Sequence, residues 1–319
     1  MRKFVALTVA AGLLVALAGC SSSSDSAAGC TPQATAGPAS NLVTATGDFG
    51  TAPTVSFYTP LDVTGPQVTT LIKGTGATVG EGDYILGEYT FVDGATGQVQ
   101  QKSSYNGSDS AGFVVGKLDA LPALDAGVRC ATVGSRLAIT MPPVAASDSS
   151  AGSADSVVAV FDVIGSFPAR ADGATQPAQA GFPSVALGPD GRPGITIPSG
   201  AVPTDLKTAV LKKGNGAVVA EGDHVVVKYT AVVWADKSVA KTTWDDGVPV
   251  VATASATQPL STTVVPALVG QTVGSQYITV VPPSAGYGST ASTDPAVPAN
   301  STLIYVVDVL GTVQATPSQ

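Results

Sequence analysis

Short runs of β-branched residues alternate with Gly- and Pro-rich turns along most of the chain. One run, Tyr277 to Val281, follows the small-residue turn Val273-Gly274-Ser275 and stops at Pro282-Pro283. Because Pro cannot donate a ladder hydrogen bond and β-branched residues favour strands, this pattern predicts a buried strand that ends at the Pro pair. The next five residues, Ser-Ala-Gly-Tyr-Gly, form a predicted loop that presents the Tyr287 hydroxyl between small residues.

The same pattern predicts further strands. They are expected at residues 68–72, 83–91, 136–141, 157–164, 208–211, 225–233 and 303–310. A helix is compatible with Ala120 to Cys130. Apolar residues also alternate along 47–60, which predicts an additional N-terminal strand, and the segment 181–203 echoes it.

The chain is predicted to contain two copies of one domain. Val133-Gly134-Ser135, Pro142-Pro143, Gly82-Asp83 and Tyr89-Thr90 all recur 140 residues later. A repeat this long is a duplicated globular unit, because solenoid repeats span about 20–50 residues. The expected boundaries are 47–166 for the first copy, 167–202 for a linker with the second lead-in segment, 203–312 for the second copy and 313–319 for a tail.

Composition narrows the classes of function. The chain has 15 Lys and Arg against 23 Asp and Glu, a net charge of −8 and a pI near 4.5. A nucleic-acid-binding protein usually carries a basic stripe, so we expect no nucleic acid partner. His224 is the only histidine and no Cys/His cluster suggests a metal, so we expect no metal site.

The order of motifs in the second copy is distinctive. It is Gly-Asp, Val-x-Val-x-Tyr-Thr, Val-Val-Pro-Ala-Leu, Val-Gly-Ser, Pro-Pro, Gly-Tyr-Gly, Val-Pro-Ala-Asn-Ser-Thr-Leu and Tyr-Val-Val-Asp-Val. This order resembles the FKBP-type peptidyl-prolyl cis-trans isomerase family over roughly 205–312, and less specifically over 66–166. The resemblance implies an α+β, mostly β fold, in which each domain is a twisted antiparallel sheet wrapped on one short helix. Between Leu268 and Gly274 the chain is four residues shorter than between Leu124 and Gly134, so we expect a trimmed helix there.

The resemblance also implies a chemistry and a site. Rotation about an X-Pro bond must overcome a barrier of about 18–20 kcal/mol, yet no bond is made or broken, so no cofactor is expected. A dry apolar pocket with a few hydrogen-bond donors suffices. The catalytic group is implied at Tyr229, Val265 and Tyr287, where the backbone N–H of Val265 would hold the substrate carbonyl. The implied substrate-binding residues are Trp244, Val264, Leu268, Val297 and Tyr305.

Departures from the family pattern leave two hypotheses for function. Ala240-Lys241 stands where the family carries Phe-Asp, and Val250 stands where it carries Phe. The chain is therefore either an isomerase that assists the folding of exported proteins through its second copy, or an inactive peptide-binding or chaperone module. In both cases we expect proline-containing unfolded or exported polypeptides as partners and a monomeric protein.

The first copy departs further from the family. Gln101-Lys102 replaces Phe-Asp, Ser147 replaces the loop Tyr and Ala159 replaces the wall Tyr, while Tyr89 is kept. We interpret this copy as a structural or docking module.

The N-terminus is expected to be a targeting segment. Arg2 and Lys3 precede the apolar stretch Phe4 to Ala16, and Leu17-Ala18-Gly19-Cys20 resembles the lipobox of bacterial, actinobacterial-like lipoproteins. This resemblance predicts a signal peptide over 1–20, lipidation of Cys20, attachment to the outer face of the cell membrane and a flexible tether over 21–46. The alternative is an ordinary secretory signal with an incidental cysteine.

Two cysteines remain beyond the targeting segment. Cys30 and Cys130 form an even pair in the oxidising compartment that the N-terminus predicts. A disulfide that ties the tether to the first copy and two unpaired small residues are both consistent with the sequence.

Overall fold

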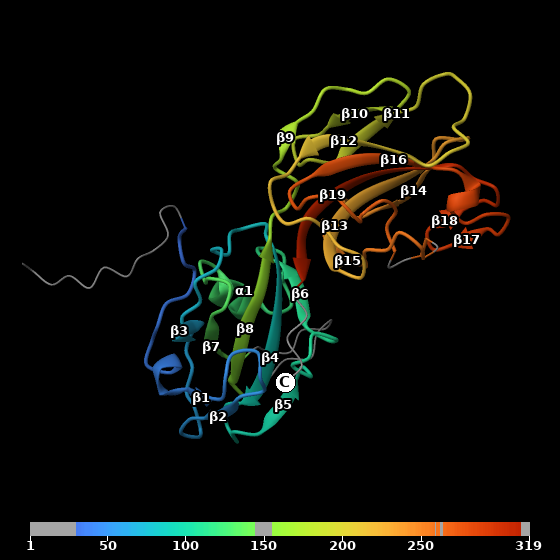
Figure 1. The fold of residues 1–319 in the computed structure, drawn as a ribbon. Helices are drawn as coiled ribbons and strands as arrows, with labels where there is room; N and C mark the ends of the chain where they lie inside the picture. The colour runs from blue at the N-terminus through green and yellow to red at the C-terminus, as the bar shows by residue number, and fades with distance from the viewer. Residues whose placement is uncertain (1–29, 144–154, 259, 262–263, 314–319) are drawn as a thin grey trace, which may run out of the picture.

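The computed structural model describes residues 30–143, 155–258, 260–261 and 264–313, arranged as two successive β domains (Figure 1). Cys20, Ser147 and the tail after Val313 lie outside the described residues. In the part of the chain that is described, no helix has the length and apolarity needed to cross a membrane.

The first domain is built on an antiparallel sheet with the strand order β3-β7-β8-β4-β5. Its strands are β3 (Gln67–Ile72), β4 (Tyr84–Asp93), β5 (Val99–Lys102), β6 (Ala111–Val114), which pairs with the start of β4, β7 (Arg136–Met141) and β8 (Val157–Phe167). The helix α1 (Pro122–Val128) packs Leu124 and Val128 into the core on one face, beside Phe161. The strands predicted in this half and the helix within 120–130 are thereby confirmed.

The second domain repeats this sheet in the order β12-β16-β19-β13-β14, with the short β9 added at the β12 edge. Its strands are β9 (Ala174–Thr175), β12 (Lys207–Lys213), β13 (His224–Val233), β14 (Val239–Thr242), β15 (Val250–Thr253), which pairs with β13, β16 (Gln276–Val281) and β19 (Leu303–Val313). A small hairpin of β17 (Ser292–Thr293) and β18 (Ala296–Val297) precedes β19. The strands predicted in this half are confirmed as well.

The helix expected in each copy is present only in the first domain of the described chain. At its place in the second domain, residues 264–271 form turns, and the nearest helical element is the 3-10 turn η2 (Pro283–Ala285). Ala267 and Gly270 both have positive φ, of 60° and 86°, which no α-helix accommodates. This connection is four residues shorter than its counterpart in the first copy, and it forms turns where the first copy forms α1.

A hairpin covers the second face of each sheet. The first consists of β1 (Thr44–Thr46) and β2 (Thr54–Ser56), which follow the 3-10 turn η1 (Ser40–Leu42), and the second of β10 (Ser184–Leu187) and β11 (Pro193–Thr196). Val55 packs near Val158 and Val160 in one domain, and Ile195 near Ile304 in the other. Within residues 47–60, where one strand is expected, the structure has β2. This strand pairs with β1 to form a separate two-stranded layer and does not join the main sheet, because the central strands are apolar on both faces.

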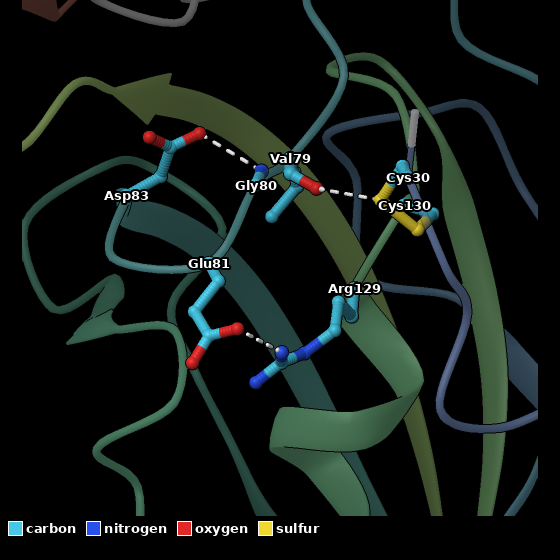
Figure 2. Close-up of a disulfide and its surroundings, with 7 residues drawn as sticks. All are labelled: Cys30, Val79, Gly80, Glu81, Asp83, Arg129 and Cys130. Carbon is cyan, nitrogen blue, oxygen red and sulfur yellow. Dashed lines mark hydrogen bonds and ion pairs between the residues drawn. A yellow bond between two sulfur atoms is a disulfide. The ribbon is translucent and has the colours of Figure 1, made fainter. Parts of the chain in front are cut away.

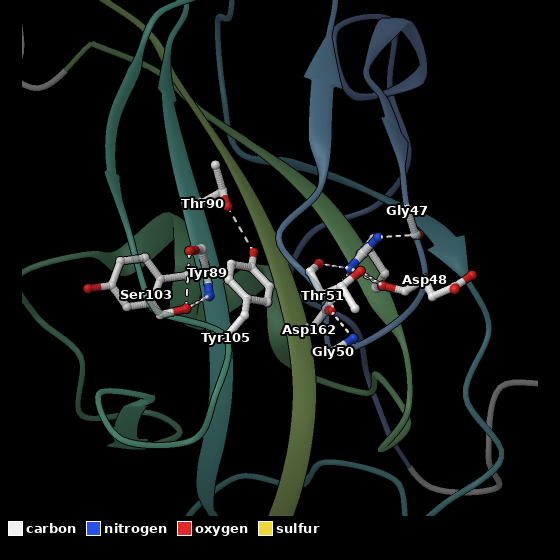
Figure 3. Close-up of polar contacts among 10 residues, drawn as sticks. Gly47, Asp48, Gly50, Thr51, Tyr89, Thr90, Ser103, Tyr105 and Asp162 are labelled. Carbon is white, nitrogen blue, oxygen red and sulfur yellow. Dashed lines mark hydrogen bonds and ion pairs between the residues drawn. The ribbon is translucent and has the colours of Figure 1, made fainter. Parts of the chain in front are cut away.

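A fully buried ion pair fixes the first hairpin to its sheet (Figure 3). The Nε and Nη2 atoms of Arg136 donate to the two carboxylate oxygens of Asp162, each at 2.7 Å. Gly50 N also donates to Asp162 Oδ2, at 2.8 Å. The remaining donors of Arg136 reach the carbonyl oxygens of Gly47, Asp48 and Thr51 at 2.7–2.9 Å. The loop between β1 and β2 is thus held by charge-assisted hydrogen bonds.

The second domain uses a neutral version of this contact. Gln276, at the place of Arg136, donates to Asp308 Oδ1 at 2.6 Å, and Ala171 N donates to the other oxygen at 2.8 Å. Lys212 Nζ donates to the Ala171 carbonyl at 3.0 Å. Burial raises the pKa of Asp308. Here the segment entering the domain, and not the hairpin loop, is tied to the sheet.

A disulfide joins Cys30 to Cys130 across a sequence separation of 100 residues (Figure 2). Of the two alternatives for these cysteines, the structure has the disulfide. Closing a loop of this length stabilises a fold by about 4.7 kcal/mol in the chain-entropy model. The Cys30 sulfur lies 3.8 Å from the Val79 carbonyl oxygen, a contact without a shared hydrogen. The start of the described chain is therefore anchored just after the end of α1.

The two domains share an apolar contact. Tyr84, Leu86, Val114 and Phe167 of the first domain pack with Val226 and Leu310 of the second. Gly311 cannot carry a side chain there, since a Cβ would lie 2.4 Å from the Phe167 ring. Lys117 Nζ also donates to the Asp246 carbonyl at 3.1 Å. Figure 1 shows the end of β19 running down beside β6 at this boundary.

We predict that Arg136→Gln destabilises the first domain by about 3–5 kcal/mol, because Asp162 would keep its buried charge and lose its partner. Denaturant unfolding followed by circular dichroism measures the change, and Arg136→Gln with Asp162→Asn should recover part of it. Unchanged unfolding of the single variant would contradict a stabilising role for this ion pair.

Candidate functional site

Three tyrosines gather on one face of the second sheet. Tyr229 comes from β13, Tyr305 from β19, and Tyr287 from the loop after η2. The rings of Tyr229 and Tyr305 lie 5.7 Å apart between centroids and are tilted by 39°. Tyr305 is paired with Ala231, two residues from Tyr229, so both rings leave the same face of adjacent strands. Tyr287 packs against this core from the loop.

The floor beneath the tyrosines is apolar. Leu268 and Val265 are buried there, and Val297 of β18 closes the same core. The Tyr277 hydroxyl donates to the Pro266 carbonyl at 2.7 Å and so fixes the turns that replace a helix. Sequence reasoning placed Tyr277 in a buried strand but missed this role, since only the fold brings it to Pro266.

The rim is held by an ion pair between β14 and the β17–β18 turn. Lys241 Nζ lies 2.7 Å from Asp294 Oδ1, and the partly buried Ala240 packs against the tyrosine core. Both charged groups are partly exposed, so the pair contributes no more than about 1 kcal/mol. Its effect is positional, because it keeps the hairpin that carries Val297 beside β14.

The three hydroxyls are neutral in the physiological pH range. Burial raises the pKa of Tyr229 to about 12, and burial also raises the pKa values of Tyr287 and Tyr305. The Tyr287 hydroxyl is buried without a hydrogen-bond partner among the described residues. Tyr305 lies close enough to influence its pKa, but no hydrogen bond of ordinary geometry joins the two hydroxyls. The Tyr287 hydroxyl thus lies close to Tyr305 and Ser292 but makes no hydrogen bond of ordinary geometry among the described residues.

A cleft of about 430 Å³ adjoins this group. Val264, Pro266 and Ala267 form one side of it, and Ser284 to Gly286 lie on another. The tyrosines do not line the cleft, but Val264 and Gly286 directly precede Val265 and Tyr287 in the chain. The cleft and the tyrosine group therefore share the segments around Val264 and Gly286.

The structure does not bring Trp244 to the site. Lys228 Nζ lies 4.8 Å from the centroid of the Trp244 ring, and the same indole contacts Gly191 in the β10–β11 turn. Lys228 precedes Tyr229 in β13 and so faces the opposite side of the sheet. Trp244 belongs to the face that the hairpin covers.

The remaining site residues thus form an apolar cluster with neutral donors, next to the cleft. No group of His, Cys, Asp and Glu that could hold a metal occurs among the described residues. A neutral amide that enters such surroundings is desolvated. Residues 216–310 match the family of FKBP-type peptidyl-prolyl cis-trans isomerases. All of the tyrosine group lies within this FKBP-type domain.

Solved structures of FKBP domains show a distant likeness to the chain. The three FKBP domains of wheat FKBP73 are 20% identical, with 78% of this chain and 95% of that chain covered and a TM-score of 0.33. AtFKBP13 is 14% identical, with 40% and 98% covered and a TM-score of 0.29. The N-terminal domain of FKBP42 from Arabidopsis thaliana is 15% identical, with 44% and 100% covered and a TM-score of 0.33. The comparison with curated proteins found no match.

The first domain keeps the backbone frame of the tyrosine group and one of its tyrosines, Tyr89. Tyr89 N donates to Ser103 Oγ at 3.0 Å (Figure 3), as Tyr229 N donates to Thr243 Oγ1 at 3.0 Å. The Tyr89 hydroxyl, however, accepts a hydrogen bond from Gln101 Nε2 at 3.0 Å. Ala159 occupies the place of Tyr305. The asymmetry expected between the copies therefore extends to the geometry of the described residues.

We predict that Tyr229 ionises near pH 12 and not near its ordinary pKa of 10.0. Its folded-state pKa is raised, so the stability it contributes is complete below pH 10 and is lost as the pH rises through 12. Tyrosinate absorbance and denaturant unfolding against pH measure both effects, with Tyr229→Phe as the reference. Ionisation of Tyr229 near pH 10 would contradict the burial of its hydroxyl.

Proposed function

We propose that the FKBP-type domain catalyses cis-trans isomerisation of X-Pro bonds in exported polypeptides. The observation that carries this proposal is the buried Tyr287 hydroxyl, which lacks a hydrogen bond of ordinary geometry and packs against an apolar cluster beside the cleft. A donor placed in a dry site is worth more to a substrate amide than the same donor in water.

The proposed mechanism needs no bond making. Apolar surroundings from Leu268 and Val265 disfavour the planar, dipolar amide relative to the twisted transition state, which lowers part of the barrier of about 18–20 kcal/mol. The Tyr287 hydroxyl and, by the family resemblance, the backbone N–H of Val265 hold the carbonyl oxygens of the substrate. Tyr229 and Tyr305 form the wall against which the prolyl ring packs.

The first domain serves as a docking or structural module in this proposal. Its equivalent of the wall tyrosine is Ala159, and its Tyr89 hydroxyl is engaged by Gln101. In this proposal, the X-Pro bonds of the client polypeptide are isomerised in the second domain alone.

We predict that Tyr287→Phe lowers kcat/KM on a Leu-Pro or Phe-Pro peptide several-fold, the effect of about 1 kcal/mol for one neutral hydrogen bond. Leu268→Ala should weaken peptide binding more, at a cost of about 2–5 kcal/mol, because it opens the floor. Tyr89→Phe in the first domain is the matched control and should leave turnover unchanged. If Tyr89→Phe lowered kcat/KM as much as Tyr287→Phe does, the proposal that catalysis occurs in the second domain alone would be contradicted.

A peptide-binding module without turnover is the second candidate, favoured by Ala240 and Lys241. Position 241 carries an ammonium group, paired with Asp294, where the family resemblance implies a carboxylate. Under this hypothesis the protein binds the peptide, and Tyr287→Phe weakens binding. Isomerisation of the X-Pro bond would still take tens to hundreds of seconds, as it does without a catalyst. An accelerated rate in the parent protein excludes this candidate.

We further propose that Cys20 carries a lipid and attaches the protein to the outer face of the cell membrane. The lipobox-like sequence supports the attachment, and the Cys30–Cys130 disulfide supports an oxidising compartment. We predict that the protein partitions with membranes and that Cys20→Ser releases or misprocesses it, as cell fractionation and mass spectrometry would reveal. A soluble, unmodified parent protein outside the cell would contradict this proposal.

A further inference from the structure

A second cavity, of about 540 Å³, lies between the two domains and away from the tyrosine group. Its first-domain wall consists of Tyr84, Leu86, Glu88, residues 106–108, Ser110 and Ile164, and its second-domain wall of His224, Val251 and Val313. In Figure 1 it corresponds to the boundary where β15 and the end of β19 face β4 and β6. Cavities at domain interfaces are preferred places for small ligands, and this volume falls in their usual range.

The polar feature of this cavity is Glu88. Its side chain is only 2% exposed. Glu88 Oε1 accepts hydrogen bonds from Gly107 N at 3.0 Å and from Ser110 Oγ at 2.8 Å. Glu88 Oε2 is buried with no partner among the described residues. A desolvated carboxylate oxygen without a partner is costly, so it marks a place where a donor from outside would be bound strongly.

The fold itself does not require a carboxylate at this position. Glu88 is paired with Asp162 in the first sheet, and its counterpart in the second sheet is Lys228, paired with Asp308. The two residues are 140 positions apart, as are the other repeated positions. Because the same site in the same sheet carries an acid in one copy and a base in the other, the acid is a feature of this cavity.

The charge and walls of the cavity define the class of ligand. None of the described residues that line it is Lys or Arg, and His224 is the lining residue that can become cationic. No ion pair of Glu88 is present among the described residues. Leu86, Ile164, Val251 and Val313 offer apolar walls for a hydrocarbon stem. A cationic head on an apolar stem matches both features.

The hydrogen bonds of Glu88 select among cationic heads. Oε1 already accepts two hydrogen bonds, which leaves Oε2 as a single acceptor. A guanidinium gains most from binding both oxygens of a carboxylate at once, whereas an ammonium acts as a point charge and needs only one. Asn106 and Ser108 are exposed loop residues that line the cavity, and Gly107 between them donates to Glu88. Binding at Oε2 therefore requires this loop to shift.

We propose that the cavity binds a primary alkylammonium group, carried by a lysine side chain or by a free amine, with Glu88 Oε2 as its acceptor. The ammonium donates to Oε2 and its stem lies between Leu86 of the first domain and Val251 of the second. Binding therefore bridges the two domains. This site is independent of prolyl isomerisation, since it shares no residue with the tyrosine group.

Calorimetric titration of the full chain with small probes tests the proposal. Nα-acetyl-lysine-N-methylamide should bind saturably and at least about tenfold more tightly than its norleucine analogue, which has the stem without the charge. The arginine analogue should bind less tightly than the lysine probe. n-Butylamine distinguishes the sources: affinity equal to that of the lysine probe indicates a free amine, and weaker binding indicates a lysine side chain.

Two variants locate the binding. Glu88→Gln keeps an acceptor for Gly107 and Ser110 but removes the charge, and it should abolish the preference for lysine over norleucine. Asp205→Asn is the matched control, because it removes one charge from an exposed position outside the cavity and should bind like the parent protein. The lysine probe should raise the Tm of the parent and of Asp205→Asn but not of Glu88→Gln.

A variant that keeps Glu88 tests the proposal independently, in case Glu88→Gln does not fold. Val251→Trp fills the cavity from the second domain and should also abolish binding of the lysine probe. The proposal is overturned if lysine and norleucine probes bind equally, if the arginine probe binds best, or if Val251→Trp or Glu88→Gln binds lysine like the parent protein.

Discussion

A buried carboxylate on the last long strand of each sheet organises the packing of this protein. Asp162 in the first domain and Asp308 in the second accept hydrogen bonds from the segment that precedes their own sheet. Such a group is stable in the interior only when its hydrogen bonds are complete, so loss of either segment would leave buried polar groups without hydrogen bonds. In the first domain this attachment holds the β1–β2 hairpin over a face lined by Val158 and Val160.

The covered second face has consequences for the FKBP-type site. Apolar residues on both sides of β13 and β19 leave these strands little freedom, because each side chain is packed in a core. The rings of Tyr229 and Tyr305 inherit this rigidity, since both leave buried strands. The site is less constrained on its loop side, where Tyr287 and the turn at Ala267 depend on the Tyr277 hydrogen bond and on the Lys241–Asp294 ion pair.

The two domains share the same backbone arrangement but carry different functional groups at equivalent positions. The backbone contact from Tyr89 to Ser103 recurs at Tyr229 and Thr243 with the same distance. The side chains placed on that frame differ: a guanidinium becomes an amide at Gln276, and an acid becomes a base at Lys228. A sheet fixes where a side chain points but not which group it carries, so one copy can present hydroxyls to a pocket while the other presents a carboxylate to the domain boundary.

The sequence by itself determined the strands, the duplication and the family of the second domain, because these depend on local periodicity and on motifs that repeat at a fixed offset. It also brought Tyr229, Tyr287 and Tyr305 into one hypothesis through family resemblance. Only the tertiary structure decided that residues 44–56 form a covering hairpin, that Trp244 lies on the opposite face from Tyr229, and that the second domain forms turns where a short helix was expected. It alone joined Cys30 to Cys130 and left Glu88 Oε2 without a partner. These outcomes depend on contacts between residues far apart in the chain, whose free energy no local pattern contains.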